Sequence, residues 1–148
     1  MTELQSILEK SNYTYDIIQH EKPILSKQEG IQYFGIEAGQ TAPALILNTD
    51  KGYIVLIVSG SRSKVNFEII ADLLSCSYAK LASPEEVQNV AGFQVGSVRI
   101  IGLDLPCVID KRLFDYAFIY GGTGHSTYTL KIEPQALNEL NEVIATFE

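Results

Sequence analysis

Two glycine-rich segments hold the residues of this chain whose types and spacing are suited to chemistry. The first contains Gly92, Gly96 and Gly102 within an otherwise apolar run that ends at Pro106. Glycine permits positive φ angles and a close approach to the main chain, so this spacing indicates exposed backbone N–H groups. Such N–H groups can bind an anion or a developing oxyanion. The alternative, a glycine-rich connection between two strands, is the more common case for such spacing.

The second segment reads Gly121-Gly122-Thr123-Gly124 and leads directly into His125. It lacks the Gly-Lys-Ser/Thr ending of a P-loop and lies between two predicted strands, which argues against a nucleotide-binding loop. An imidazole in this polar loop could donate a hydrogen bond to a bound carbonyl or orient a water molecule. A solvent-exposed histidine without such a role is the alternative. A Ser/His/Asp triad can also be written from Ser97, His125 and Asp104, but this combination is unspecific.

The composition limits the class of protein. The chain has 148 residues, 46% of them hydrophobic and 20% charged, which is typical of one globular domain over residues 1–148. The net charge of −7 argues against an extended nucleic-acid surface, because such surfaces depend on clustered Lys and Arg. Arg62 with Lys64, and Lys111 with Arg112, form local basic pairs that could steer one end of a polynucleotide. Solvated surface charge is the more common role of such pairs.

Neither a membrane segment nor a metal site is expected. No apolar run approaches the ~20 residues needed to span a bilayer, and the start of the chain lacks a signal-peptide pattern, so we expect a cytoplasmic protein without a membrane partner. No His-x-x-x-His or Cys-x-x-Cys spacing is present, so we expect no metal and no cofactor. Cys76 and Cys107 are expected to be reduced. No feature of the sequence predicts an oligomeric state.

Periodicity and capping residues predict the elements that position these segments. Helices are predicted over residues 3–11, from Ser26 to near Gly35, over 66–74, from Ser83 to Gly92, and from about Pro134. Strands are predicted over residues 13–19, 44–48, 53–58, 107–110, 117–120, 128–132 and 143–147. The hairpin formed by residues 44–58 is expected at the centre of the core. The mixed order of helices and strands predicts an α+β fold with a mixed sheet.

Several short motifs in combination resemble a known family. They are His20 with Pro23 and Ser26, Gly39-Gln40-Thr41 before the hairpin, Leu81-Ala82-Ser83-Pro84-Glu85-Glu86-Val87, Gly92-Phe93 with Gly96-Ser97-Val98, Leu105-Pro106 with Ile109-Asp110, and Tyr120-Gly121-Gly122 with Thr129-Leu130. In this combination and order the chain resembles the YbaK / prolyl-tRNA synthetase-associated domain family, whose members hydrolyse mischarged aminoacyl-tRNA. The resemblance covers nearly the whole chain.

The resemblance implies a single α+β domain with a mixed, strongly curved β-sheet flanked by helices. It also implies a trans-acting deacylase that clears a small mischarged amino acid, with the acceptor end of aminoacyl-tRNA as its partner. Loop N–H groups would hold the ester while a water, helped by the terminal ribose hydroxyl, attacks the carbonyl. On this basis Gly96 and His125 are the catalytic candidates, and the substrate-binding candidates are Ser97, Val98, Arg99, Gly121, Gly122, Thr123 and Gly124.

Two positions depart from the family's pattern. The resemblance places a lysine just before the first hairpin strand, where this chain has Pro43, and a proline where this chain has Ile100. A binding module with weak or no turnover is therefore the alternative to a deacylase. If the protein is an enzyme, Arg99, Lys51 or His125 could supply the missing charge or hydrogen bond.

Overall fold

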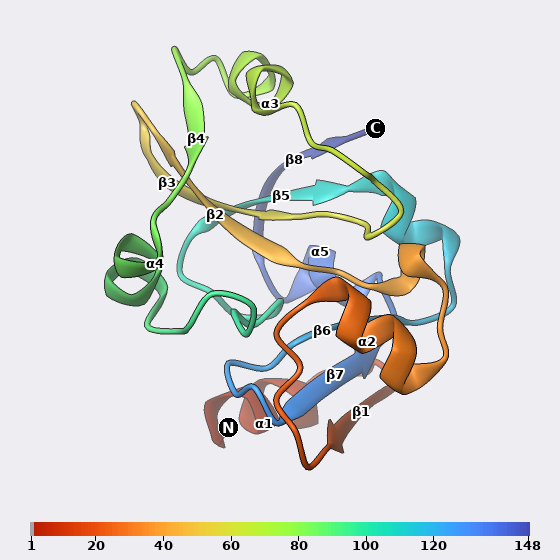
Figure 1. The fold of residues 1–148 in the computed structure, drawn as a ribbon. Helices are drawn as coiled ribbons and strands as arrows, with labels where there is room; N and C mark the ends of the chain where they lie inside the picture. Colours follow the sequence, from red (N-terminus) through yellow and green to blue (C-terminus); the bar gives the residue numbers. More distant parts are fainter. Residues whose placement is uncertain (1) are drawn as a thin grey trace.

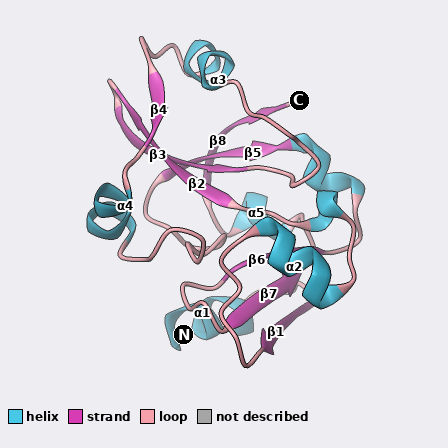
Figure 2. Ribbon diagram, viewed as in Figure 1, coloured by secondary structure: helices cyan, strands magenta, loops and turns pink. Residues whose placement is uncertain are grey.

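The computed structural model describes residues 2–148 and places them in two β-sheets with helices around them (Figures 1 and 2). The helices are α1 (Thr2–Glu9), α2 (Lys27–Phe34), α3 (Phe67–Leu73), α4 (Pro84–Ala91) and α5 (Ala136–Glu139), with 3₁₀ helices η1 (Ala38–Gln40) and η2 (Lys111–Asp115). The strands are β1 (Tyr15–Gln19), β2 (Ala44–Thr49), β3 (Gly52–Ile57), β4 (Ala79–Leu81), β5 (Pro106–Asp110), β6 (Ile119–Gly122), β7 (Tyr128–Ile132) and β8 (Glu142–Phe147). None of these helices is long and apolar enough to cross a membrane.

The larger sheet has five strands in the order β4-β2-β3-β5-β8. The antiparallel β2–β3 hairpin lies inside this sheet, as predicted, while β3, β5 and β8 run parallel. Successive residues of β3 point to opposite faces, so Val55 and Ile57 join one hydrophobic cluster and Ile54 and Leu56 join another. The central strands are therefore buried on both faces. Strand β4 was not predicted, because three residues carry too short a pattern.

The smaller sheet is antiparallel, with the order β1-β7-β6. The sequence predicted one mixed sheet, and the resemblance implied that it is strongly curved, whereas the structure has two sheets; β1, β7 and β6 form their ladders with one another. A single parallel bridge between Thr41 and Tyr120 joins this sheet to the segment before β2, where Ala42 N–H donates to Tyr120 O at 2.8 Å. This bridge lies at the wall of the pocket described below.

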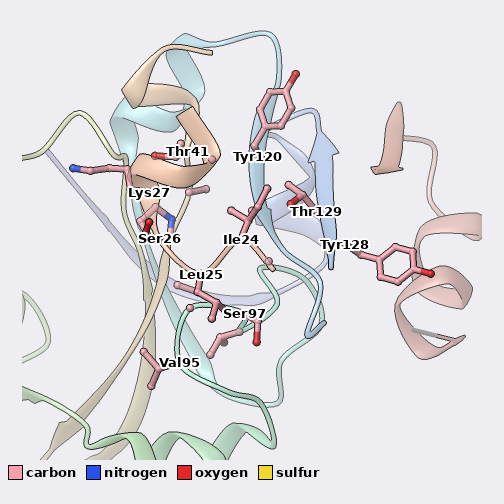
Figure 3. A pocket seen from close by; sticks show the side chains of 18 of the residues that line it. Ile24, Leu25, Ser26, Lys27, Thr41, Val95, Ser97, Tyr120, Tyr128 and Thr129 are labelled. Carbon is pink, nitrogen blue, oxygen red and sulfur yellow. The ribbon is translucent and has the colours of Figure 1, made fainter. Parts of the chain in front are cut away.

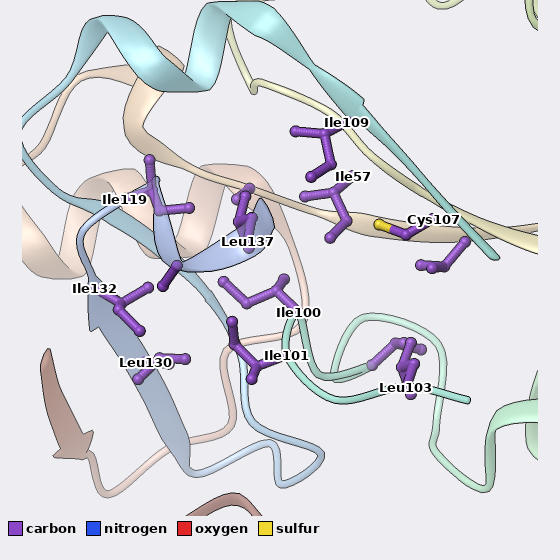
Figure 4. Close-up of a cluster of buried hydrophobic side chains, with 14 of the residues drawn as sticks. Ile57, Ile100, Ile101, Leu103, Cys107, Ile109, Ile119, Leu130, Ile132 and Leu137 are labelled. Atoms are coloured by element: carbon purple, nitrogen blue, oxygen red, sulfur yellow. The ribbon is translucent and has the colours of Figure 1, made fainter. Parts of the chain in front are cut away.

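The first glycine-rich segment fills the space between the two sheets (Figure 4). Ile100 and Ile101 are fully buried and join one cluster with Ile57 of the larger sheet and Leu130 of the smaller. Burying each such side chain contributes about 1.5–3 kcal/mol to stability. Cys107 lies in the same cluster, and burial raises the pKa of its thiol to about 12. The buried apolar residues therefore hold this segment in place, and its glycines lie on a main chain whose position the core fixes.

Capping residues start and end the helices near the pocket as predicted. Ser83 forms a capping box with Glu86 at the start of α4, and Gly92 ends that helix with φ +77°. Ser26 caps α2 by accepting from Glu29 N–H, and the Glu29 carboxylate accepts from Leu25 N–H and from the Ser26 hydroxyl. The bond to Leu25 holds the chain that enters α2 against the helix.

Candidate functional site

A cavity of about 260 Å³ lies where the two sheets meet. It is lined by residues 24–27, Gly30, Phe34, Ile36, residues 41–45, residues 95–98, residues 120–122, His125, Tyr128 and Thr129. Figure 3 shows Val95 and Leu25 toward one end of this pocket and Tyr120 at the other. Both glycine-rich segments therefore contribute to one pocket, together with the start of α2 and the start of β2.

The Gly96 turn forms one part of the pocket wall. Ser97 N–H donates to Gln94 O at 3.0 Å, and Gly96 has φ +90°, as the third residue of a type II turn requires. A Cβ on Gly96 would lie 2.6 Å from Leu25 O. Within residues 2–148 the N–H groups of Gly96 and Val98 have no hydrogen-bond acceptor. Both residues line the pocket.

Gly121 and Gly122 lie in strand β6, so the prediction that the strand ends at Tyr120 is wrong for these two residues. Neither has a positive φ. A Cβ on Gly122 would lie 2.2 Å from Val98 O, and one on Gly121 would lie 2.6 Å from the Cδ1 atom of Ile100. Glycine at these positions lets β6 approach the first glycine-rich segment closely.

Hydrogen bonds tie the loops around the pocket together. Gly124 N–H donates to Ser97 O at 2.8 Å, and Ile24 N–H donates to Ser126 O at 2.9 Å. Gly124 does not line the pocket. It has a φ of +96° and lies against the Phe93 ring, so glycine suits the bend of the chain at this position. The segments before α2, after α4 and after β6 thus form one connected rim.

His125 lines the pocket, whereas Thr123, two residues earlier, does not line it and contacts the main chain of His125. Thr123 is 2% exposed, and its hydroxyl oxygen accepts from His125 N–H at 3.2 Å. The unspecific Ser97/His125/Asp104 combination is not supported, because the Ser97 hydroxyl donates to Gln94 O and Asp104 lines a separate hollow beside α5. His125 can therefore act on a ligand directly but not through Ser97.

His20 orients a hydroxyl in the pocket wall. It is 4% exposed, with Nδ1 2.7 Å from Lys22 O and Nε2 3.0 Å from the Thr129 hydroxyl. A carbonyl only accepts, so Nδ1 carries hydrogen, and in the neutral ring Nε2 accepts from the Thr129 hydroxyl. The Thr129 oxygen then keeps a lone pair for a donor in the pocket.

A family profile described as the aminoacyl-tRNA editing domain matches residues 21–140, which include every element of the pocket. The chain belongs to this family. The resemblance noted from the sequence is thereby confirmed.

Relatives of this editing domain are found among longer and similar-sized proteins. A proline–tRNA ligase of Thermosipho melanesiensis is 28% identical over 105 residues, covering 70% of this chain and 18% of the ligase. The chain therefore spans about a fifth of the length of that ligase. The crystal structure of hypothetical protein APE2540 has a TM-score of 0.88 at 21% identity, covering 97% of both chains. A candidate trans-editing enzyme for prolyl tRNA synthetase has a TM-score of 0.83 at 23% identity, covering 97% of this chain and 92% of that one. These two likenesses show the fold.

Arg99, expected to bind substrate, does not line the pocket of this editing domain. Arg99 is 8% exposed, and its Nη2 lies 2.9 Å from Glu3 Oε1 and 2.8 Å from Gly102 O. The side chain thus fastens the glycine-rich segment to α1. Lys51 is also far from the site, in the β2–β3 turn with its Nζ donating to Leu74 O.

Lys27 is the one lysine or arginine among the described residues that line the pocket. Its Nζ donates to Gly60 O at 3.0 Å, and in Figure 3 it points away from Thr129. Pro43 lines the pocket at the position where the resemblance places a lysine. Lys27 was not predicted as a site residue. The Ser26 cap predicts that the helix begins at Lys27, but no local pattern predicts that this end of the helix lies at a pocket.

The described residues offer no metal site. No group of three or more His, Cys, Asp or Glu side chains within residues 2–148 is placed to hold an ion.

Proposed function

We propose that this pocket hydrolyses the ester between a small, mischarged amino acid and the 3′ end of a tRNA, as a trans-acting deacylase. Membership of the aminoacyl-tRNA editing domain family supports a role in editing. The observation that carries the proposal is the turn around Gly96, which lines the pocket and leaves the N–H groups of Gly96 and Val98 without acceptors within residues 2–148. The N–H group of Gly96, inside the Gln94–Ser97 turn, and that of Val98, just after it, would donate to the ester carbonyl oxygen.

The proposed reaction needs no side-chain nucleophile. A water attacks the ester carbonyl carbon, and the N–H groups of Gly96 and Val98 stabilise the negative charge that develops on its oxygen. The bond to the ribose oxygen then breaks, this oxygen takes a proton, and free amino acid leaves. Removing one such donor costs about 10²–10³ in rate in other enzymes. His125, at the pocket wall, would position the water or donate to the carbonyl.

The pocket wall favours a small uncharged side chain on the amino acid. None of the described lining residues is Asp or Glu, so a lysyl or arginyl side chain would find no carboxylate partner. Apolar side chains such as Ile24, Leu45 and Val98 make up much of the wall. One methylene changes selectivity only about 10–200-fold, so a panel of amino acids must decide among the small ones.

A binding module without turnover is the second candidate, and Pro43 favours it. The Pro43 ring lines the pocket where the resemblance places a lysine, and the Lys27 ammonium is bound to Gly60 O. Such a protein would hold an aminoacyl ester in the same pocket. The rate of ester hydrolysis separates the two candidates.

A panel of tRNAs, each carrying one labelled amino acid, tests the proposal. We expect the unmodified protein to release at least one small amino acid faster than the uncatalysed rate. Pro43→Lys and Pro43→Ala form a matched pair, because both remove the ring and only one adds a cation. An inert parent with activity gained only by Pro43→Lys would favour the binding module. No release by the parent or by Pro43→Lys would contradict the deacylase.

A further inference from the structure

The loop of residues 59–64, between β3 and α3, starts at the pocket wall. Gly60 N–H donates to Thr41 O at 2.9 Å, and Val58 N–H just before it donates to Pro43 O at 3.1 Å. Thr41 and Pro43 both line the pocket. A ligand that enters the pocket on this side therefore passes the loop.

Three basic side chains from separate segments gather on this loop. Lys27 of α2 donates to Gly60 O at 3.0 Å, and Arg112 of η2 donates through Nη1 to the Ser61 hydroxyl at 3.2 Å. Lys64 belongs to the loop itself and is exposed. The two basic pairs noted in the sequence are thus neighbours in the fold, and Lys27 joins them from the pocket.

The carboxylates near the loop do not neutralise these three charges. Asp110 is fully buried and bound by Arg62, whose Nη2 lies 2.9 Å from Asp110 Oδ1. Burial opposes ionisation of Asp110, but these bonds and the N–H groups of Ser59 and Arg112 outweigh it, so the pKa of Asp110 is lowered. The charges of Arg62 and Asp110 therefore cancel.

The Glu148 carboxylate pairs with Lys111 at 3.8 Å. Within residues 2–148, Lys27, Lys64 and Arg112 take part in no ion pair. In a chain of net charge −7, three unpaired cations beside one pocket mark a place where an anion is favoured.

Gly60 allows the loop to hold this arrangement. A Cβ at this position would lie 1.9 Å from the Thr41 hydroxyl oxygen and 2.8 Å from the Cδ atom of Lys27. The Lys27 stem therefore packs directly on the loop backbone, and its ammonium is kept at the rim of the pocket.

We propose that Lys27, Lys64 and Arg112 form a phosphate-binding surface for the 3′ strand of a tRNA whose terminal nucleotide enters the pocket. Lys27 lines the cavity, whereas Lys64 and Arg112 do not. The proposal assigns the backbone phosphates, rather than the ester, to these three side chains. It rests on the proposed function for the identity of the polynucleotide. Three contacts form a small site, consistent with the strongly acidic composition.

The salt dependence of binding to tRNA that carries no amino acid tests this surface. For single strands the slope of log K against log salt is about −0.7 per phosphate contact, so losing two contacts should make it shallower by about 1.4. We would compare the full chain with the pair Lys64→Gln, Arg112→Gln. The control pair Lys10→Gln, Lys80→Gln removes the same charge from α1's end and from β4, both away from the loop in Figure 1.

A shallower slope in the loop pair alone supports the surface. An unchanged slope in the loop pair, or an equal loss in the control pair, overturns it. The outcome is independent of hydrolysis: a protein that deacylates with an unchanged slope keeps the proposed function and loses this surface. A protein with the expected slope change and no deacylation keeps the surface and loses the enzyme. Stronger competition by polyglutamate than by RNA would point to an acidic protein partner and would also overturn it.

Discussion

Gly96 and Gly122 both line the pocket, yet glycine is required at the two positions for different reasons. Gly96 has φ +90°, a conformation that side-chain-bearing residues rarely adopt. Gly122 lies in β6 without a positive φ, but a Cβ there would be 2.2 Å from Val98 O. Glycine at position 96 allows the main chain to adopt a positive φ, whereas glycine at position 122 allows the Val98 carbonyl to approach β6 closely.

The difference shows how the two segments depend on each other. Within residues 2–148 the N–H groups of Gly96 and Val98 have no acceptor, while the glycines of β6 set how closely that segment lies to the sheet. Ile100 connects the two: it is fully buried, its N–H donates to Gly122 O at 3.2 Å, and its side chain lies over Gly121. A proline at this position could not make that hydrogen bond. The isoleucine therefore holds the segment by burial and by hydrogen bonding to β6.

The largest effect on stability is expected from Gly122→Ala. The added methyl group meets the carbonyl of Val98, which is main chain and cannot rotate away. The strands must separate, so we expect a loss of about 3 kcal/mol in unfolding free energy, at the upper end for overpacking. Urea unfolding with an unchanged m-value measures it. A loss below about 1 kcal/mol would mean that β6 does not need this close approach.

A smaller loss of stability and a large loss of activity are expected from Gly96→Ala. Gly92→Ala is its matched control: Gly92 also has a positive φ, but nothing lies within 4 Å of its Cβ position. The control should lose about 1 kcal/mol, since it carries the φ penalty alone. Gly96→Ala should lose about 2 kcal/mol, because it adds the contact with Leu25 O to that penalty.

Measuring deacylation by the same two variants separates the effect on the shape of the Gly96 turn from the effect on the stability of the protein. Gly96→Ala displaces the N–H groups assigned to the ester carbonyl, so we expect about a 10²-fold fall in kcat/KM. Gly92→Ala should deacylate as the parent does. Equal activity in the two variants, measured below their unfolding transitions, would remove the Gly96 turn from the proposed mechanism.

Local signals predicted most elements of the fold but not their pairing. The Ser83 cap, the Gly92 helix end and the hairpin around Gly52 depend on neighbouring residues, and the structure confirms them. The division into two sheets depends on partners distant in sequence, such as Ile17 with Leu130, and no local pattern specifies such a pair.

The candidate site follows the same rule. Both glycine-rich segments could be found from the sequence, because glycine is required there by backbone geometry or by close packing. Lys27 and the diversion of Arg99 to Glu3 could not be found, since a charged side chain carries no mark of its partner. The catalytic roles assigned to Gly96 and His125 stay predictions.

The smallest loss of stability is expected from Gly121→Ala. Because this loss depends on the Ile100 side chain, it distinguishes the role of Gly121 from that of Gly122. Its methyl group would meet the Cδ1 atom of Ile100 at 2.6 Å, a side-chain atom that can move or be removed. We expect a loss of about 1.5 kcal/mol for Gly121→Ala and about 1 kcal/mol for Ile100→Val alone. The double variant should lose less than the sum, because valine lacks Cδ1, but the rescue should be partial, because valine keeps the Cγ2 atom that would lie 2.8 Å from the added methyl group. Ile100→Val should not rescue Gly122→Ala, where the obstruction is the Val98 carbonyl. Strict additivity at Gly121, measured by urea unfolding, would show that Ile100 does not set the distance between β6 and the glycine-rich segment.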